Sequence, residues 1–399
     1  MRSRLAGSAA DQLLSSTSNS LILLTLARSM DLSEFGTVAV AYSFFAFALA
    51  VQRNTIGVPL QADLPTEAHG QPLIARSMAA SAGLGGVVGV LVLAGSVVLP
   101  TADAVVMALL AATIPVALAQ DCLRFAATSS GRPSLALGSD VTWFVATAVG
   151  FVLSVARGVP PAFLLALWLG GAVAALVVIW LGLSRPPLRV AGVAAMLREP
   201  RRVHLASESA ASASTGLVLV NGLALVAGTA TVGAFRAAST LFGPLGVVAS
   251  FLIFGVGPEM SRTDHRGRRR LAVLFGSASA LLALAWGWIL AVNPYDLGTL
   301  LLGDTWSSVR DLVPVFAVQA AGFGVLTAFS TQLRIAGCTK VVMRMLTGHA
   351  VVAVTATLVV GATIGTAMSV ATVLAALNLA TAALSGVLAH RYDRGQRVT

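Results

Sequence analysis

Two apolar stretches of the chain carry an acid and two hydroxyls at positions i, i+4 and i+7, which lie on one face of a helix. The residues are Asp11, Ser15 and Ser18 in the first stretch, and Glu208, Ser212 and Thr215 in the seventh. Because polar side chains are costly against lipid, we expect both stripes to face the protein interior. They would form a cavity wall, a cation site or a proton site. Alternatively, each acid closes a gate or pairs with arginines at the inner helix ends.

Two arginines fall inside apolar stretches. Arg53 lies in the second stretch and Arg236 in the eighth. An intramembrane arginine costs several kcal/mol unless it meets water, an acid or a ligand. The planar guanidinium suits a phosphate or pyrophosphate group. The alternative is that both side chains extend to the nearer membrane interface.

Neutral polar residues in the same stretches could line a path for a sugar; the main ones are Gln52, Asn54, Asn221 and Gln319. Such side chains also join helices by hydrogen bonds. Asp121 and Asp140 flank a loop that holds Arg124 and Arg132. We expect these four residues to form a local ion-pair network.

Enzyme signatures are not found. The only lysine, Lys340, is not part of a phosphate-binding loop, and no histidines and cysteines have metal-ligand spacing. Cys122 and Cys338 are predicted at cytoplasmic helix ends, where neither a disulfide nor a metal site is expected. We therefore expect no catalytic residues, no cofactor and no metal.

Composition defines the elements that position these residues. The 399-residue chain is 57% hydrophobic and 11% charged, with a mean hydropathy of +0.87. Soluble domains carry about 25% charged residues. The sequence therefore predicts an all-α polytopic membrane protein with about 12 transmembrane helices. The apolar stretches cover 8–27, 35–58, 77–99, 103–123, 137–157, 161–183, 206–227, 233–256, 271–292, 311–333, 344–363 and 368–389.

The basic residues set the orientation. With both termini in the cytoplasm, most of the 26 basic residues fall at inner loops and helix ends, whereas Arg28, Arg157 and Arg310 fall outside. This asymmetry follows the positive-inside rule. The net charge of +10 is explained by basic residues that set the orientation and face anionic inner-leaflet lipids, so no nucleic-acid partner is expected.

The chain also shows signs of an internal duplication. At an offset of 210, LRFA at 123–126 matches LRIA at 333–336, and at an offset of 197 Asp11 matches Glu208. The expected division is a six-helix lobe at 1–183, a cytoplasmic linker at 184–205 and a second six-helix lobe at 206–399. An even number of helices per repeat predicts pseudo-two-fold symmetry about the membrane normal.

Several motifs are similar to those of one transporter group. LAR at 26–28 and LSEFG at 32–36 resemble the first outer turn and the start of the second helix in polysaccharide exporters. GAFRAA at 233–238, LFGPL at 241–245 and PE at 258–259 resemble their eighth helix, and QDCLRF at 120–125 with GRP at 131–133 resembles their fourth. These exporters belong to the multidrug/oligosaccharidyl-lipid/polysaccharide (MOP) flippase superfamily.

The resemblance implies a MATE-like fold with an alternating-access cavity between the lobes. It implies transport of a polyprenyl-pyrophosphate-linked saccharide from the cytoplasmic to the outer leaflet of a bacterial cytoplasmic membrane. It also implies a cationic cavity, to which Arg53 and Arg236 correspond by helix. Glycosyltransferases or a polymerase of the same pathway would be partners. The first helix lacks the central arginine found in the group, and the lipid II subtype has fourteen helices and is not expected.

Three other functions remain open at this stage. A multidrug/cation antiporter of the MATE branch would need an acid near the middle of a spanning helix. A major-facilitator transporter is suggested by DHRGRR at 264–269, although its expected counterpart at 63–71 is missing. A non-transporting scaffold of a glycan-assembly complex would keep its function without Arg53 and Arg236.

Overall fold

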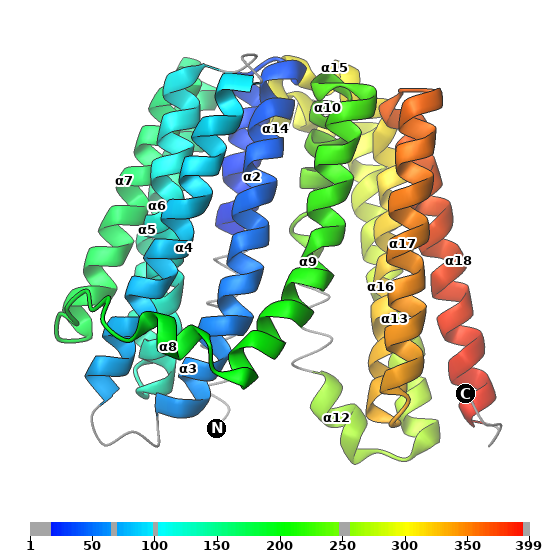
Figure 1. Cartoon of the computed structure of the whole chain (residues 1–399). Helices are drawn as coiled ribbons and strands as arrows, with labels where there is room; N and C mark the ends of the chain where they lie inside the picture. Colours follow the sequence, from blue (N-terminus) through cyan, green and yellow to red (C-terminus); the bar gives the residue numbers. More distant parts are fainter. Residues whose placement is uncertain (1–16, 65–69, 99–102, 247–255, 394–399) are drawn as a thin grey trace. The chain divides into compact units, whose positions relative to one another are not determined.

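The structure is a computed structural model of the chain and describes residues 17–64, 70–98, 103–246 and 256–393. Within these ranges all regular structure is helical. Figure 1 shows the helices coloured from blue near the N-terminus to red near the C-terminus. The chain divides into two compact units, Met1–Asn221 and Gly222–Thr399. The division falls inside one helix, α9.

The helices of the first unit are 17–29, α2 (Leu32–Gln52), η1 (Arg53–Gly57), α3 (Val58–Asp63), α4 (Gly70–Val98), α5 (Ala104–Ser129), α6 (Pro133–Arg157), α7 (Pro161–Gly182), α8 (Val193–Leu197) and the first part of α9 (Pro200–Ala227). Helix starts follow local chemistry. Asp31 accepts hydrogen bonds from the amides of Ser33 and Glu34, both at 2.8 Å, and so caps α2. α6 ends at Gly158, which has a φ of +58°.

Glycines let α4 and α5 approach closely. A Cβ atom on Gly85 would lie 2.5 Å from the Cα of Pro115, and one on Gly89 would lie 2.7 Å from the carbonyl oxygen of Ala111. No larger residue fits at these positions without moving the backbone. This tight packing fixes α5, which carries several of the candidate site residues.

The second transmembrane segment changes its helical geometry near its end. α2 passes into the π-helix η1 and then into α3, which Figure 1 shows as one continuing segment. Pro59 has no N–H group, so in a regular helix the carbonyl of Thr55, four residues earlier, would lose its partner. Single π-helical turns inside α-helices are frequent at functional sites.

The second unit contains the rest of α9 and then α10 (Thr229–Leu241), α12 (Gly257–Arg262), α13 (His265–Val292), α16 (Val313–Ile335), α17 (Thr339–Thr363) and α18 (Ala367–Asp393). Small residues join α13 to α16. A Cβ atom on Gly324 would lie 2.7 Å from that of Ser279, and one on Gly287 would clash with that of Ala317. These contacts leave the opposite face of α13 exposed.

Ten helical segments of the described residues are long and apolar enough to span a membrane. The first and eighth of the twelve expected spans fall partly on residues 1–16 and 247–255, outside the described residues. Several helices start earlier than expected; for example, α6 starts at Pro133 and α17 at Thr339, because polar ends continue the helices.

The connection at 293–310 is not an irregular loop. It folds into η4 (Pro294–Asp296), α14 (Leu297–Leu302), η5 (Gly303–Thr305) and α15 (Trp306–Val309), and η6 (Arg310–Leu312) leads into α16. The linker expected at 184–205 contains α8 and the first residues of α9. This helix begins at Pro200 rather than at the expected position 206.

Candidate functional site

A charged cluster lies inside the first unit, where η1 meets α5. Arg53 binds Asp121 through two nitrogens: Nη2 donates to Oδ1 at 2.7 Å and Nε donates to Oδ2 at 3.0 Å. This is the bidentate geometry that fixes a guanidinium in orientation as well as position. Arg53 therefore meets an acid within the protein rather than extending to the interface.

A second arginine extends the cluster to α6. Arg124 donates to Asp121 at 2.9 Å and pairs with Asp140 at 3.0 Å. Gln120 donates to Asp140 at 3.1 Å and to Ser139 at 2.8 Å. The expected pairing of Arg124 with both acids is thus present. Arg132, expected in the same network, instead donates to the Gly182 carbonyl at 3.0 Å.

The cluster, which we call the Arg53 network (Arg53, Asp121, Arg124 and Asp140), has two positive and two negative charges. Buried charges are tolerated when they are paired and hydrogen-bonded. The exposed fractions of the side chains are 5% for Asp121, 8% for Arg124 and 4% for Asp140, but 28% for Arg53. Arg53 is therefore the member that a ligand can reach, and its Nη1 makes no hydrogen bond to the described residues.

A separate charged cluster holds the start of α9 against α3 within the first unit. Arg202 is only 1% exposed; it pairs with Asp63 at 3.0 Å and with Glu199 at 2.8 Å. Its Nη1 also donates to the carbonyl of Thr55 at 3.3 Å. This is the carbonyl whose donor in a regular α-helix would be the missing N–H group of Pro59. Arg202 thus supplies this carbonyl with a side-chain donor and joins α9 to α3 through Asp63.

The neutral candidates of the first unit bind neighbouring helices. Gln52 is buried and donates to Ser81 at 3.2 Å, and Asn221 donates to Ser43 at 2.9 Å. Asn54 is exposed and donates to Ser209 at 3.1 Å. Asn54 is therefore the one of these three that lies next to Arg53 and is accessible.

The polar stripes are only partly described. Asp11 and Ser15 lie outside the described residues, and Ser18 is buried in the helix at 17–29. On α9, Glu208 is exposed and Thr215 is half-buried; Ser212 lies on the same helix between them. No hydrogen bond or ion pair joins Glu208 to the described residues.

The candidates of the second unit lie on two different helices, α10 and α16. Arg236 is half-buried on α10, where its carbonyl accepts hydrogen bonds from Ser239 and Thr240. Gln319 is half-buried on α16, and its Oε1 has no hydrogen-bond partner among the described residues. The structure thus brings Arg53 and Asn54 together in one unit and leaves Arg236 and Gln319 in the other.

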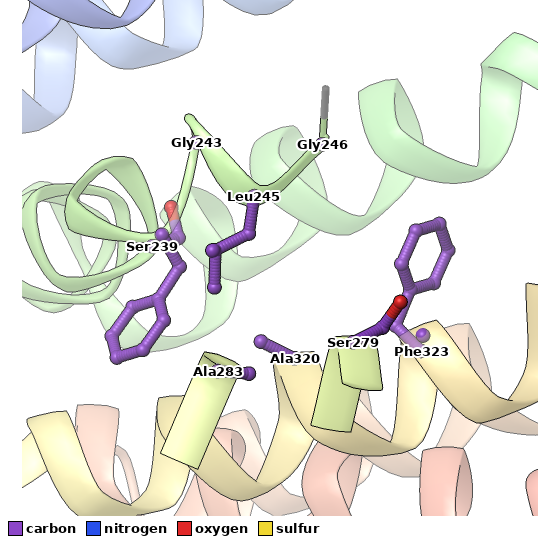
Figure 2. Close-up of a pocket in the computed structure, with 10 residues that line it drawn as sticks. Ser239, Gly243, Leu245, Gly246, Ser279, Ala283, Ala320 and Phe323 are labelled. Carbon is purple, nitrogen blue, oxygen red and sulfur yellow. The ribbon is translucent and has the colours of Figure 1, made fainter. Parts of the chain in front are cut away.

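An apolar cavity of about 220 Å³ lies in the second unit between the end of α10, α13 and α16. Figure 2 shows Leu245 pointing toward Ala283 and Ala320, with Ser279 and Phe323 at one side. Small-molecule sites commonly have about 300–1,000 Å³. The space that the described residues enclose is small and apolar for a saccharide.

Within the described ranges, no three His, Cys, Asp or Glu side chains come together in a way that could hold a metal ion. The sequence matches no protein-family model and no curated protein. Solved structures provide the comparison.

The arrangement is that of a multi-pass helical membrane transporter fold. A multidrug-resistance MATE transporter of the MOP superfamily, in its inward-facing conformation, matches with a TM-score of 0.66 and 11% identity over 96% of this chain and 95% of that one. The lipid II flippase MurJ, in an inward closed conformation, matches with a TM-score of 0.60 and 10% identity over 96% and 90%. A MOP-superfamily transporter from Pyrococcus furiosus matches with a TM-score of 0.54 and 11% identity over 97% and 96%.

These matches show that the chain has the fold of the MOP-superfamily transporters over nearly its whole length. The resemblance expected from the sequence motifs is confirmed at the level of fold. The same matches do not favour the major-facilitator alternative.

Proposed function

We propose that this protein is a flippase that moves a saccharide linked to a polyprenyl pyrophosphate from the cytoplasmic to the outer leaflet. It would act by alternating access in a bacterial cytoplasmic membrane, with both termini in the cytoplasm. Glycosyltransferases or a polymerase of the same pathway would supply or use the cargo. The fold supports transport, since its neighbours include both MATE transporters and a lipid II flippase.

The observation that carries the proposal is the state of Arg53. Its guanidinium is held by a buried carboxylate on one edge and is 28% exposed. Charge-assisted hydrogen bonds to phosphate are about twice as strong as neutral ones. Because Arg124 pairs with both Asp121 and Asp140, it offsets the negative charge behind Arg53. The exposed edge of the cluster is thus cationic and suits a diphosphate.

The neighbouring polar groups fit the sugar that follows the diphosphate. Asn54 is exposed beside Arg53 and already bonds Ser209 on α9. Amide and hydroxyl groups of this kind donate to and accept from sugar hydroxyls. Glu208, the residue directly before Ser209, is exposed and would add to a polar surface along α9. We place Arg236 in the same function as the cationic residue of the second half.

The antiporter alternative requires an acid that is available to a cation. The two buried acids of the Arg53 network, Asp121 and Asp140, are both paired with arginine. A carboxylate held by a guanidinium is a poor site for a further cation. The structure therefore favours an anionic headgroup over a cationic drug at this site.

The test is deletion of the gene followed by mass spectrometry of polyprenyl-linked lipids. We expect a complete lipid-linked saccharide to accumulate, and the wild-type gene to reverse the accumulation. Arg53→Ala should fail to reverse it while inserting normally. Arg132→Ala is the matched control, because it removes an arginine near the end of α5 that lies outside the network.

Full complementation by a well-inserted Arg53→Ala protein would remove the headgroup role. An unchanged lipid profile together with new sensitivity to cationic drugs would support the antiporter. An unchanged profile with normal function of both Arg53→Ala and Arg236→Ala proteins would support a scaffold.

A further inference from the structure

A hollow of about 510 Å³ lies on the surface of α13 near its first residue. Its lining combines two chemistries: the arginines Arg266, Arg269 and Arg270, and the apolar side chains Val273 and Leu274. All five side chains are exposed. The arginines come first along the helix and the apolar residues follow one turn later.

The hollow lies on the face of α13 that does not pack on α16. The packed face consists of small residues, including Ala272, Gly276 and Ser279. Leu274 is two residues from Ala272 and Gly276, so it points to the opposite side of the helix. The hollow therefore belongs to the outer surface of the second unit.

The same face continues with large apolar side chains. Leu281 is 67% exposed and Trp288 is 69% exposed. A spanning helix that exposes residues of this type faces acyl chains rather than water. Arginines at one end of such a face and a tryptophan near the other match the interfacial anchors of a lipid-facing helix.

Two further charged groups near the start of α13 have partners within the same segment. Arg262 pairs with Glu259 at 2.8 Å, and Asp264 accepts the Gly267 amide at 2.8 Å. The cap occupies the helix N-terminus, so a ligand would be recognised by the arginine side chains. An orientation signal requires only the number of charges; it does not require three arginines on the face that carries Val273 and Leu274.

We propose that this hollow binds an anionic phospholipid of the surrounding leaflet. The phosphate lies among Arg266, Arg269 and Arg270, and an acyl chain lies along Val273 and Leu274. Four residues of helix rise about 6 Å, which is the distance from Arg270 to Leu274. That length matches the step from a phosphate to the start of its acyl chain. Basic pockets at the cytoplasmic ends of membrane helices recognise such headgroups.

The experiment is native mass spectrometry of the purified full-length protein with added phosphatidylglycerol or phosphatidylcholine. We expect the wild-type protein to retain phosphatidylglycerol in preference to phosphatidylcholine. The triple variant Arg266→Gln/Arg269→Gln/Arg270→Gln should bind phosphatidylglycerol roughly a hundredfold more weakly, since each of the three basic residues near an anionic surface contributes about 1 kcal/mol.

The matched control removes the same charge from the loop before α9. Arg185, Arg189 and Arg198 are exposed and lie outside the hollow, so the corresponding triple Gln variant should retain phosphatidylglycerol as the wild type does. Equal losses in both triple variants would show a general charge effect and overturn the site.

A second arm separates a lipid from free phosphate. Val273→Ser/Leu274→Ser should weaken phosphatidylglycerol retention although all three arginines remain. Thermal unfolding with inorganic phosphate should show no stabilisation that depends on the arginines. Unchanged lipid retention in the Ser variant, or a phosphate shift lost in the Gln variant, would show an anion site without a lipid.

Discussion

The Arg53 network predicts unequal costs for removing its two ends. In Asp121→Asn, both Arg53 and the buried Arg124 lose a carboxylate. Leaving a buried charge without its partner costs about 3–5 kcal/mol. Asp140 still pairs with Arg124 at 3.0 Å, so we expect a loss near the lower end, about 3 kcal/mol.

Arg53→Ala leaves a different situation. Asp121 keeps Arg124 at 2.9 Å, and the lost guanidinium was partly exposed to begin with. Hydrogen bonds to charged groups contribute about 1.5–3 kcal/mol when buried. We expect a loss of about 1–2 kcal/mol, reduced by the exposure of Arg53. The variant should therefore fold while losing transport.

The free energy of unfolding is measured by denaturant titration in micelles, with tryptophan fluorescence as the signal. Trp143 and Trp168 of the first unit lie 5.4 Å apart and report on α6 and α7. A double-mutant cycle of Arg53→Ala and Asp121→Asn isolates the pair, with a coupling of about 1 kcal/mol expected. If Arg53→Ala were as destabilising as Asp121→Asn, Arg53 would be a structural residue, and its assignment to a ligand would fail.

Three further outcomes follow from the structure. Arg202→Met should lower the free energy of unfolding by about 2 kcal/mol, because the variant removes a donor to the buried Thr55 carbonyl and the cation that pairs with Asp63 and Glu199. A loss below about 1 kcal/mol in the same titration would contradict this. Gly85→Val should reduce the amount of folded protein in size-exclusion chromatography, because its side chain would meet Pro115, whereas normal yield would show that α4 and α5 can separate. Glu208→Gln should keep wild-type stability, and a changed dependence of transport on the proton or sodium gradient would assign ion coupling to the exposed acid.

The sequence predicted the existence of the spanning helices well because hydropathy is local. It missed their first turns: α2 starts at Leu32, after the Asp31 cap, and α6 starts at Pro133, ahead of the expected starts at 35 and 137. The pair of Arg124 and Asp121 was also predictable, since the two residues are three positions apart on one helix. The helices at 293–310 were not predicted. Each is only three to six residues long, which is too short to give a periodic hydropathy pattern.

The partner of Arg53 was not predictable in the same way. Asp121 is 68 positions away, and its contact with Arg53 depends on how η1 packs against α5. The same is true of Arg202, which the sequence presents as one of many loop arginines although it is buried. One signal was available: an arginine and two acids in neighbouring apolar helices must find charged partners. The position of each charged residue along its helix would have suggested which residues pair.

The bond between Arg202 and the Thr55 carbonyl joins two positions 147 residues apart. It predicts the order in which Arg202 and Pro59 arose during evolution. A proline at position 59 is better tolerated where a guanidinium already supplies a donor to the Thr55 carbonyl. An arginine at 202 can precede that proline, whereas the reverse order passes through an intermediate in which the Thr55 carbonyl lacks this side-chain donor. Related chains should therefore include some with Arg202 and no Pro59, and few with Pro59 and no basic residue at 202. Pro59→Ala should relax the requirement, so that Arg202→Met becomes milder in that background.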